Sequence, residues 1–180
     1  TTGLPPPNEA SSGQLEVPVI LKEVGAGLSA EDVQLLLAGG IRYLDVAGSG
    51  GTSWSRIEHH DPANAGGGDL GLLFEDWGLP TPIALRALKP YRERFTLIAS
   101  GGLRSGIDMA KAMILGASLC GMAAPFLKPA MESAEKVSEL ILRLKREFVT
   151  ALFLLGQASA QGLIGNESLL LNPAEMGRNT

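Results

Sequence analysis

Four short apolar runs divide the chain, and each has the length of a β-strand. They cover residues 17–21, 41–46, 95–99 and 119–122. The first run is continuous enough to be typical of a parallel strand buried on both faces of a sheet, where apolar and polar residues no longer alternate. The first two runs begin 24 residues apart, at 17 and 41, and so do the last two, at 95 and 119. This spacing predicts two β–α–β units, each with a right-handed crossover.

The segments between these runs carry signals for helices. We predict helices over residues 29–38, 71–76, 81–88, 107–115 and 133–157. Ser29 and Asp32 form a capping pair at the start of the first helix, and the glycines at 39–40 end it. Thr81 followed by Pro82 is typical of a helix cap and its first turn. The chain therefore alternates strands with helices, as an α/β fold does.

Two stretches differ in their apolar periodicity. The last predicted helix has an apolar stripe at helical spacings, formed by Val137, Leu140, Ile141, Leu144, Phe148, Leu152 and Leu155. We interpret this stripe as core or interface rather than as a cofactor site. Residues 56–69 have no apolar period and include a run of glycines, so we predict a mobile loop there.

The glycine-rich and charged turns each follow the C-terminal end of a predicted strand. Functional loops on that face are characteristic of the (β/α)₈ barrel, which needs eight strands and about 250 residues. This chain has four predicted strands in 180 residues. We therefore predict an α/β fold in which residues 17–160 form the C-terminal four βα units of an eight-stranded TIM barrel. Residues 1–16 are predicted to be a linker or disordered terminus, and residues 161–180 a C-terminal tail.

A glycine loop, Ser100-Gly101-Gly102-Leu103-Arg104, connects the third predicted strand to a helix. Glycines let the backbone approach an anion closely, and the free N–H groups of the first helical turn point at it. Arg104 adds a permanent positive charge with forked donors suited to phosphate. We interpret this stretch as a phosphate-binding loop. The alternative is a plain βα turn that needs glycine only for its geometry.

The composition of the chain indicates which classes of protein and partner are compatible with it. The net charge is −4 and 45% of the residues are hydrophobic, which suits a globular domain and argues against nucleic acid as a general partner. No apolar run is long enough to span a membrane, and the first residues lack the basic and apolar segments of a signal peptide. We therefore expect a cytoplasmic protein. Cys120, the single cysteine, excludes an internal disulfide and is expected to be a buried, inert thiol.

Six motifs follow one another along the chain. They are Val17-Pro-Val-Ile-Leu-Lys-Glu-Val-Gly25, Asp45-Val-Ala-Gly-Ser-Gly-Gly-Thr52, Ile57-Glu58, Asp76-Trp-Gly-Leu-Pro-Thr81, Ser100-Gly-Gly-Leu-Arg-Ser-Gly-Ile-Asp108 and Gly121-Met-Ala-Ala-Pro125. Together, over about residues 17–158, they resemble type 2 isopentenyl-diphosphate isomerase, an FMN-dependent TIM-barrel enzyme. The glycine loop alone is shared by many FMN barrels, so the specificity lies in the combination and order of the motifs.

The resemblance implies an activity and the residues that serve it. The family interconverts isopentenyl and dimethylallyl diphosphate by an allylic proton shift on reduced FMN, with Mg²⁺ on the diphosphate and NADPH as the reductant. The implied catalytic residues are Lys22, which would sit at the flavin ring and stabilise its reduced, anionic form, and Glu58, which would lie near the substrate. The implied FMN-binding residues are Lys22, Thr52, Gly101, Gly102, Leu103, Arg104, Ala123 and Ala124. The resemblance also implies a homo-oligomer, and it assigns no metal ligand in this chain.

The sequence departs from the family pattern in two ways. Ala47 stands where the family often has serine, which removes one hydroxyl contact. The N-terminal half of the family, which carries a Gln-Glu pair whose glutamate binds the metal, has no counterpart here. We therefore expect the chain to correspond to the C-terminal half of the family barrel.

Two other functions are compatible with the same residues. FMN-dependent 2-hydroxy-acid oxidases and dehydrogenases share the glycine loop, but they place a histidine and an arginine after the sixth strand, and the loop at residues 48–52 contains no histidine. A non-catalytic half-barrel that binds phosphate, or serves as an assembly subunit, is the third interpretation.

Several side chains have an ordinary structural explanation beside the functional one. Lys22 could be a lysine that keeps its charge in solvent at a strand end, and Glu58 could be a solvated carboxylate. The run at 59–61, His-His-Asp, has metal-ligating types, but adjacent histidines point apart and no third ligand has suitable spacing. Trp54 and Trp77 could line a pocket or pack in the core.

Overall fold

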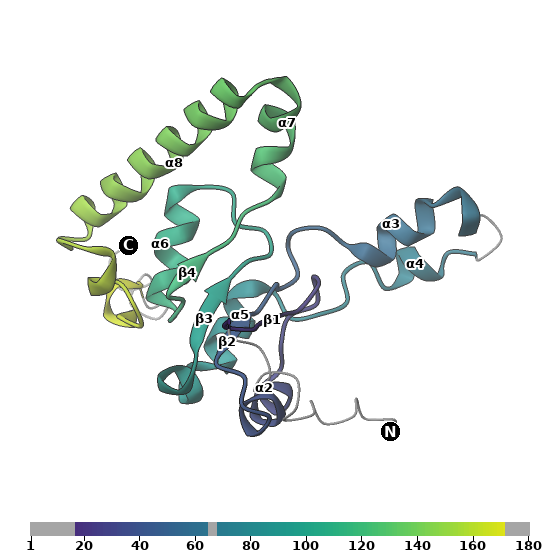
Figure 1. The fold of residues 1–180 in the computed structure, drawn as a ribbon, viewed down its shortest axis with the longest axis horizontal. Helices are drawn as coiled ribbons and strands as arrows, with labels where there is room; N and C mark the ends of the chain where they lie inside the picture. Colours follow the sequence, from purple (N-terminus) through teal and green to yellow (C-terminus); the bar gives the residue numbers. More distant parts are fainter. Residues whose placement is uncertain (1–16, 65–67, 172–180) are drawn as a thin grey trace, which may run out of the picture.

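The computed structural model describes residues 17–64 and 68–171, and its strands form one parallel sheet. The strands are β1 (Ile20–Lys22), β2 (Tyr43–Asp45), β3 (Thr96–Ala99) and β4 (Leu119–Cys120). They stand in chain order, and each pairs in parallel with the next (Figure 1). This order confirms the two predicted β–α–β units of a partial barrel. The linker predicted at residues 1–16 lies outside the described residues.

Helices separate the strands where the sequence predicts them. They are α2 (Ala30–Ala38), α5 (Thr81–Ala87), α6 (Gly106–Ile114) and α8 (Ala134–Leu154), with α4 (Leu70–Leu73) near the predicted short helix. Short 3₁₀ turns span η1 (Pro62–Asn64), η2 (Lys89–Arg94), η3 (Ala160–Gly162) and η4 (Glu167–Leu169). The Ser29 capping box is confirmed, because its hydroxyl accepts a hydrogen bond from the Asp32 amide at 3.1 Å and the Asp32 carboxylate accepts one from the Ser29 amide at 3.3 Å. Local capping signals therefore fixed this helix boundary.

The core consists of two apolar clusters. The larger joins the central strands to α2 and α5, and Leu44, Leu97, Val33 and Leu85 are fully buried in it. The smaller packs α6 against α8 and includes Leu163, which follows η3 and is also fully buried. In the predicted apolar stripe of α8, Leu140 and Leu144 are buried, and Phe148, Leu152 and Leu155 pack against this smaller cluster, whereas Ile141 is 50% exposed.

The two outer strands are less buried than their apolar sequences predict. Val17 and Ile20, in the run that contains β1, are exposed, and so is Leu119 of β4. Each of these strands has a neighbour on one side only among the described residues. Full burial is confined to Leu44 and Asp45 of β2 and to Leu97 and Ala99 of β3, so the predicted burial on both faces fails at the edges and is only partial in the central strands.

The mobile loop predicted for residues 56–69 is wrong over its first part, where the chain forms α3 (Trp54–His60). The Ser53 hydroxyl caps this helix by accepting a hydrogen bond from the Arg56 amide at 3.3 Å. None of the residues of α3 is buried, so no apolar period marks the helix in the sequence. Figure 1 shows α3 and α4 projecting from the body of the molecule.

A second helix, α7 (Ala124–Glu132), was not predicted. Pro125 lies in its first turn, where proline is tolerated, but Pro129 lies inside it and argues against a helix. The turn that ends the β4 motif is therefore the start of α7. Within residues 17–64 and 68–171, no helix combines the length and the apolar composition needed to cross a membrane.

We expect Leu163→Ala to lower the free energy of unfolding of the full-length protein by about 2–5 kcal/mol, because it leaves a cavity between α6 and α8. Leu171→Ala, at an exposed position, is the matched control and is expected to change it by about 0.5 kcal/mol or less. Urea denaturation followed by circular dichroism measures both. Equal effects would show that the segment after residue 160 contributes nothing to the core.

Candidate functional site

A cleft of about 430 Å³ opens at the C-terminal ends of the strands. The sequence-predicted residues that line it are Lys22, Thr52, Gly101, Gly102, Leu103, Arg104, Ala123 and Ala124. These residues lie at the C-terminal ends of the four strands or in the segments that follow them, and only the sheet brings them together. Each residue that the sequence analysis assigned to the cofactor therefore lies in one cleft.

The loops after β2 and β3 lie so close that side chains do not fit between them. Gly101 has φ +94°, and a Cβ atom there would overlap the carbonyl oxygen of Gly48. Gly102 has φ +82°, and its Cβ would lie 2.5 Å from the carbonyl oxygen of Gly50. Glycine is required at both positions because φ is positive and because a Cβ atom would overlap the facing backbone. The geometric explanation of these glycines is thus confirmed, and the same contact forms one wall of the cleft.

Thr81 holds this contact in place, although the sequence predicted it to cap a helix. Pro80 occupies the N-cap position of α5, and the buried Thr81 hydroxyl instead lies 2.6 Å from the Gly101 carbonyl oxygen and 3.0 Å from that of Ser100. The prediction of the cap is wrong because the carbonyl groups of the glycine loop compete for the hydroxyl. Thr81 is therefore part of the support of the cleft.

Backbone N–H groups on two sides of the cleft are available to an anion. Within the described ranges, the amides of Gly102, Leu103, Ala123 and Ala124 have no protein acceptor. Ala124 is the first residue of α7, so the partial positive charge of that helix end adds to its amide. This arrangement of free donors suits a phosphate group.

The first turn of α6 supplies fewer free donors than the sequence predicted: among the described residues only its Ile107 amide has no protein acceptor, and Ile107 does not line the cleft. The Gly106 amide donates to the Glu147 carboxylate of α8 at 2.8 Å, and the Asp108 amide donates to the Ser105 hydroxyl at 3.1 Å. The Arg104 amide donates to the Asp108 carboxylate at 3.0 Å. Carboxylate and hydroxyl groups of the protein occupy these positions. The donors for an anion come instead from the loop before α6 and from the start of α7.

Lys22 and Arg104 are the cationic side chains that line the cleft. The Arg104 guanidinium donates to the Gly50 carbonyl oxygen at 2.9 Å, which ties the loop after β3 to the loop after β2. The Lys22 ammonium donates to the Glu23 carbonyl oxygen at 3.0 Å and lies 3.9 Å from the Asp45 carboxylate. With Asp45 as the one acidic lining residue, the described lining carries a net charge of +1, from two cations and one anion.

Asp45 and Ser100 are site residues that the sequence analysis did not assign. Asp45 is buried, and its Oδ1 accepts hydrogen bonds from the Ser100 hydroxyl at 2.7 Å and from the Ala47 amide at 3.1 Å. The sequence did contain a signal for them, because a carboxylate at the end of an apolar strand is expected to be buried and a buried charge requires polar partners. Together with Lys22, this carboxylate links the ends of β1, β2 and β3.

Other candidate residues lie outside the cleft. Glu58 is exposed on α3, and its carboxylate accepts a hydrogen bond from the Asn64 side chain at 2.8 Å. The rings of His59 and His60 meet edge to face, and no group of three metal-ligating side chains occurs within residues 17–64 and 68–171. Trp54 does line the cleft, whereas Trp77 is exposed and packs edge to face on Phe74. Neither tryptophan is in the core.

Cys120 is a half-buried thiol at the end of β4. Burial raises its pKa to about 11, so the thiol is protonated at neutral pH. This agrees with the predicted inert thiol, since the thiolate is the reactive form.

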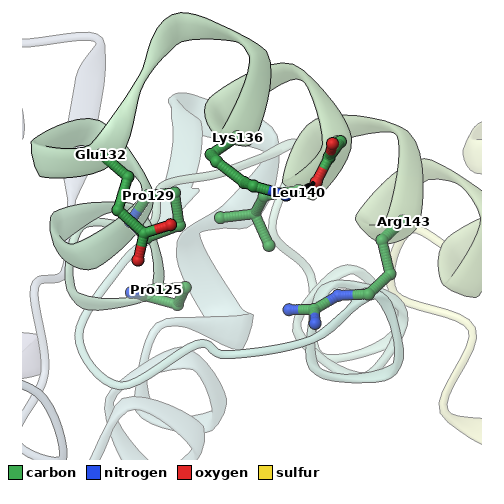
Figure 2. Close-up of a pocket in the computed structure, with 7 residues that line it drawn as sticks. Pro125, Pro129, Glu132, Lys136, Leu140 and Arg143 are labelled. Carbon is green, nitrogen blue, oxygen red and sulfur yellow. Dashed lines mark hydrogen bonds and ion pairs between the residues drawn. The ribbon is translucent and has the colours of Figure 1, made fainter.

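A second cleft, of about 280 Å³, lies between α7 and α8 and contains none of the predicted site residues. Figure 2 shows Pro125, Pro129 and Glu132 of α7 on one side of it and Lys136, Leu140 and Arg143 of α8 on the other. Its acidic and basic groups are mixed, and Lys136 is paired with Glu139 at 2.7 Å. The candidate site is therefore the cleft at the strand ends.

Comparisons with known proteins agree on family and fold. Residues 10–170 match the FMN-dependent dehydrogenase family. The chain is 52% identical over 157 residues to the isopentenyl-diphosphate delta-isomerase of Hydrogenovibrio crunogenus, covering 87% of this chain and 46% of that protein. It is 53% identical over 165 residues to the enzyme of the same name from Paracoccus zeaxanthinifaciens, covering 89% and 47%. The chain thus spans about half the length of the curated relatives it matches.

Solved structures share the fold at low sequence identity. The L230A mutant of flavocytochrome b2 with benzoylformate aligns with a TM-score of 0.63 at 18% identity, covering 96% of this chain and 42% of that one. Mandelate oxidase aligns with a TM-score of 0.59 at 23% identity, covering 87% and 39%. These alignments confirm the predicted partial TIM barrel.

We expect Gly101→Ala to lower the free energy of unfolding by more than about 2 kcal/mol, because it adds both a strained φ and an overlap with the Gly48 carbonyl. Gly121→Ala is the matched control in the same cleft. Its φ is ordinary and its Cβ would lie 3.2 Å from the Ser100 Cβ, so a loss below about 1 kcal/mol is expected. Urea denaturation of the full-length variants compares them. A fully stable Gly101→Ala protein would contradict the close contact of the two loops.

Proposed function

This chain belongs to the FMN-dependent dehydrogenase family, and we propose that the full-length protein is an FMN-dependent isopentenyl-diphosphate isomerase. The observation that carries the proposal is the convergence of eight predicted cofactor residues in one cleft at the strand ends. The identity of 52–53% to isomerases, over nearly nine-tenths of the chain, supports this substrate class over others in the family.

The cleft suits the phosphate group of FMN. The free amides of Gly102, Leu103, Ala123 and Ala124 provide neutral donors, and Arg104 provides a charged one. Because Gly101 and Gly102 have no side chains, a ligand in the cleft can approach the backbone of this loop directly. These residues would bind and orient the cofactor through its phosphate, which is the part of FMN that takes no part in the chemistry.

Lys22 is proposed to contact the flavin ring. When bound and reduced, FMN would supply the chemistry for an allylic proton shift, and a positive charge near the ring is a known way to tune its electronics. Asp45 and the Glu23 carbonyl oxygen hold the Lys22 ammonium at the C-terminal end of the strands. The role of Thr52 as an FMN ligand is also part of the proposal and is supported by its position in the cleft.

The remaining features of the proposed reaction stay predictions. Glu58 lies outside the cleft, and its contact with substrate stays a prediction. Mg²⁺ on the diphosphate also stays a prediction, because residues 17–64 and 68–171 contain no group of three side chains that could hold a metal ion. The proposal further includes NADPH as the reductant, a homo-oligomer and a cytoplasmic location.

An FMN-dependent 2-hydroxy-acid oxidase is the alternative enzyme. The fold is shared with flavocytochrome b2 and mandelate oxidase, but a shared fold at 18–23% identity carries no activity. The loop at residues 48–52 has no histidine that could take part in oxidising a hydroxy acid. A non-catalytic phosphate-binding protein would use the same donors without turnover, so activity separates it from the proposal.

We expect the full-length protein, with FMN, NADPH and Mg²⁺, to convert isopentenyl diphosphate into dimethylallyl diphosphate. Product is measured by chromatography, and omission of the reductant or addition of EDTA is expected to abolish it. Lactate and glycolate, added without NADPH, are expected to leave the flavin absorbance unchanged. Flavin bleaching by either acid would favour the oxidase, and FMN binding without any product would favour the non-catalytic alternative.

We expect Arg104→Ala to weaken FMN binding by about 10- to 100-fold, the equivalent of losing one charge-assisted hydrogen bond worth about 1.5–3 kcal/mol. The exposed guanidinium is not part of the core, so apo-protein stability should fall by about 0.5 kcal/mol or less. FMN titration by flavin fluorescence, paired with thermal melting of the apo-protein, measures both quantities. Arg94→Ala, at an exposed position of η2, is the control and should leave FMN binding intact. Unchanged affinity in Arg104→Ala would remove Arg104 from the phosphate site.

A further inference from the structure

The turn after β1 folds around a single carboxylate. The Oε2 atom of Glu23 accepts hydrogen bonds from three consecutive backbone amides, those of Gly25 at 2.6 Å, Gly27 at 3.0 Å and Ala26 between them. Consecutive amides that converge on one point form a concavity that binds anions. Here the chain supplies the anion itself, because the half-buried Glu23 side chain fills the concavity. The shape of the turn therefore depends on Glu23.

Two neighbouring loops touch this turn through their backbones. A Cβ atom at Gly25 would lie 2.9 Å from the Thr52 carbonyl oxygen, so the turn lies directly against the loop after β2. The Ala26 carbonyl oxygen accepts a hydrogen bond from the Leu79 amide at 2.7 Å, in the segment before α5. Backbone contacts leave no flexible side chain to absorb a change of shape. A turn that loses its form therefore displaces the end of β1 relative to these loops.

The residues beside Glu23 line the cleft, whereas Glu23 itself does not. Lys22, Val24 and Gly25 belong to the lining. The Lys22 ammonium donates to the Glu23 carbonyl oxygen at 3.0 Å, and the Glu23 amide donates to the Asp45 carbonyl oxygen at 3.2 Å. The backbone of Glu23 thus connects the Lys22 ammonium to β2, and its carboxylate acts on the cleft only through the residues on either side.

We propose that Glu23 is a positioning residue that holds Lys22 at the flavin ring, a role that rests on the proposed function of Lys22 there. Without the carboxylate, three half-buried amides lose their acceptor, and the turn has to change shape to find others. The Glu23 carbonyl oxygen then moves, and the Lys22 ammonium moves with it. Because the interaction of two charges weakens with their separation, a displaced ammonium stabilises reduced, anionic FMN less well.

A direct electrostatic effect of Glu23 would have the opposite sign. Removal of a negative charge near the flavin favours the reduced anion and raises the reduction potential of bound FMN. Displacement of the Lys22 ammonium disfavours the reduced anion and lowers that potential. The direction of the change therefore separates positioning through Lys22 from a field effect of the carboxylate, and a role in folding alone leaves the potential unchanged.

Redox titration of FMN bound to the full-length protein tests this role. Glu23→Ala removes the carboxylate, Glu23→Gln removes the charge but keeps an oxygen acceptor, and Lys22→Met removes the ammonium but keeps a side chain of similar length. Asp32→Ala is the matched control, because the Asp32 carboxylate also accepts a backbone amide, that of Ser29 at 3.3 Å, but lies outside the cleft. Glu23→Ala is also titrated in the Lys22→Met background. Thermal melting establishes that each variant is folded.

Glu23→Ala is expected to weaken the preference for reduced over oxidised FMN about 10-fold, which lowers the two-electron potential by about 30 mV. Glu23→Gln should lower the potential less, because its side-chain oxygen still accepts from the turn. Asp32→Ala should leave the potential unchanged. Once Lys22→Met is present, Glu23→Ala should add no further shift, since it acts through the ammonium that is already absent.

An unchanged or raised potential in Glu23→Ala, or in Glu23→Gln if the alanine variant does not fold, would overturn the positioning role and leave the proposed function intact. An equal shift by Glu23→Ala in the presence and absence of Lys22 would overturn it as well. A potential that Lys22→Met does not change would remove Lys22 from the flavin ring, and the role of Glu23 with it. A wild-type protein that binds no FMN would overturn the proposed function itself.

Discussion

The cleft depends on one close contact, between the backbone of the loop after β2 and that of the loop after β3. The Gly48 amide donates to the Ser100 carbonyl oxygen at 3.1 Å, and the Thr81 hydroxyl lies within hydrogen-bonding distance of the same oxygen and of the Gly101 carbonyl. Backbone touches backbone because Gly101 and Gly102 have no side chains to separate it. The carbonyl groups of the loop point into this contact and are satisfied there. The amides that follow are left without protein partners, and this makes the wall of the cleft a surface of donors.

A buried carboxylate provides the second constraint. Asp45 accepts hydrogen bonds from Ser100 and Ala47 and faces the Lys22 ammonium, so three strand ends meet at one charge. A buried carboxylate is stable only with such partners, because desolvation otherwise favours its neutral form. Ala47 lies at φ +34°, a conformation that non-glycine residues rarely adopt, in the same turn. The hydrogen bonds and ion pair of Asp45 thus hold the ends of the three strands together beneath the cleft, in addition to the pairing of the strands.

The two edges of the sheet expose apolar side chains. At the sheet edges, Ile20 of β1 and Leu119 of β4 are exposed next to strands that have one neighbour each among the described residues. Closure of an eight-stranded barrel would cover such edges with further parallel strands. The inner face of α8, by contrast, already packs against α6.

The sequence by itself determined the features whose physical causes act over a few residues. Apolar runs located the four strands, Ser29 with Asp32 fixed the start of α2, and Gly116, at φ +113°, ended α6. Motif resemblance located the residues that line the cleft, although only the sheet brings them together. Tertiary structure decided how polar groups are satisfied, because their partners are distant in sequence. Glu147, 41 positions away, takes the Gly106 amide that local reasoning left for an anion, and Ser100 bonds Asp45 from 55 positions away. Likewise α3 buries nothing and α7 contains an internal proline, so neither left an apolar or propensity signal from which it could be predicted.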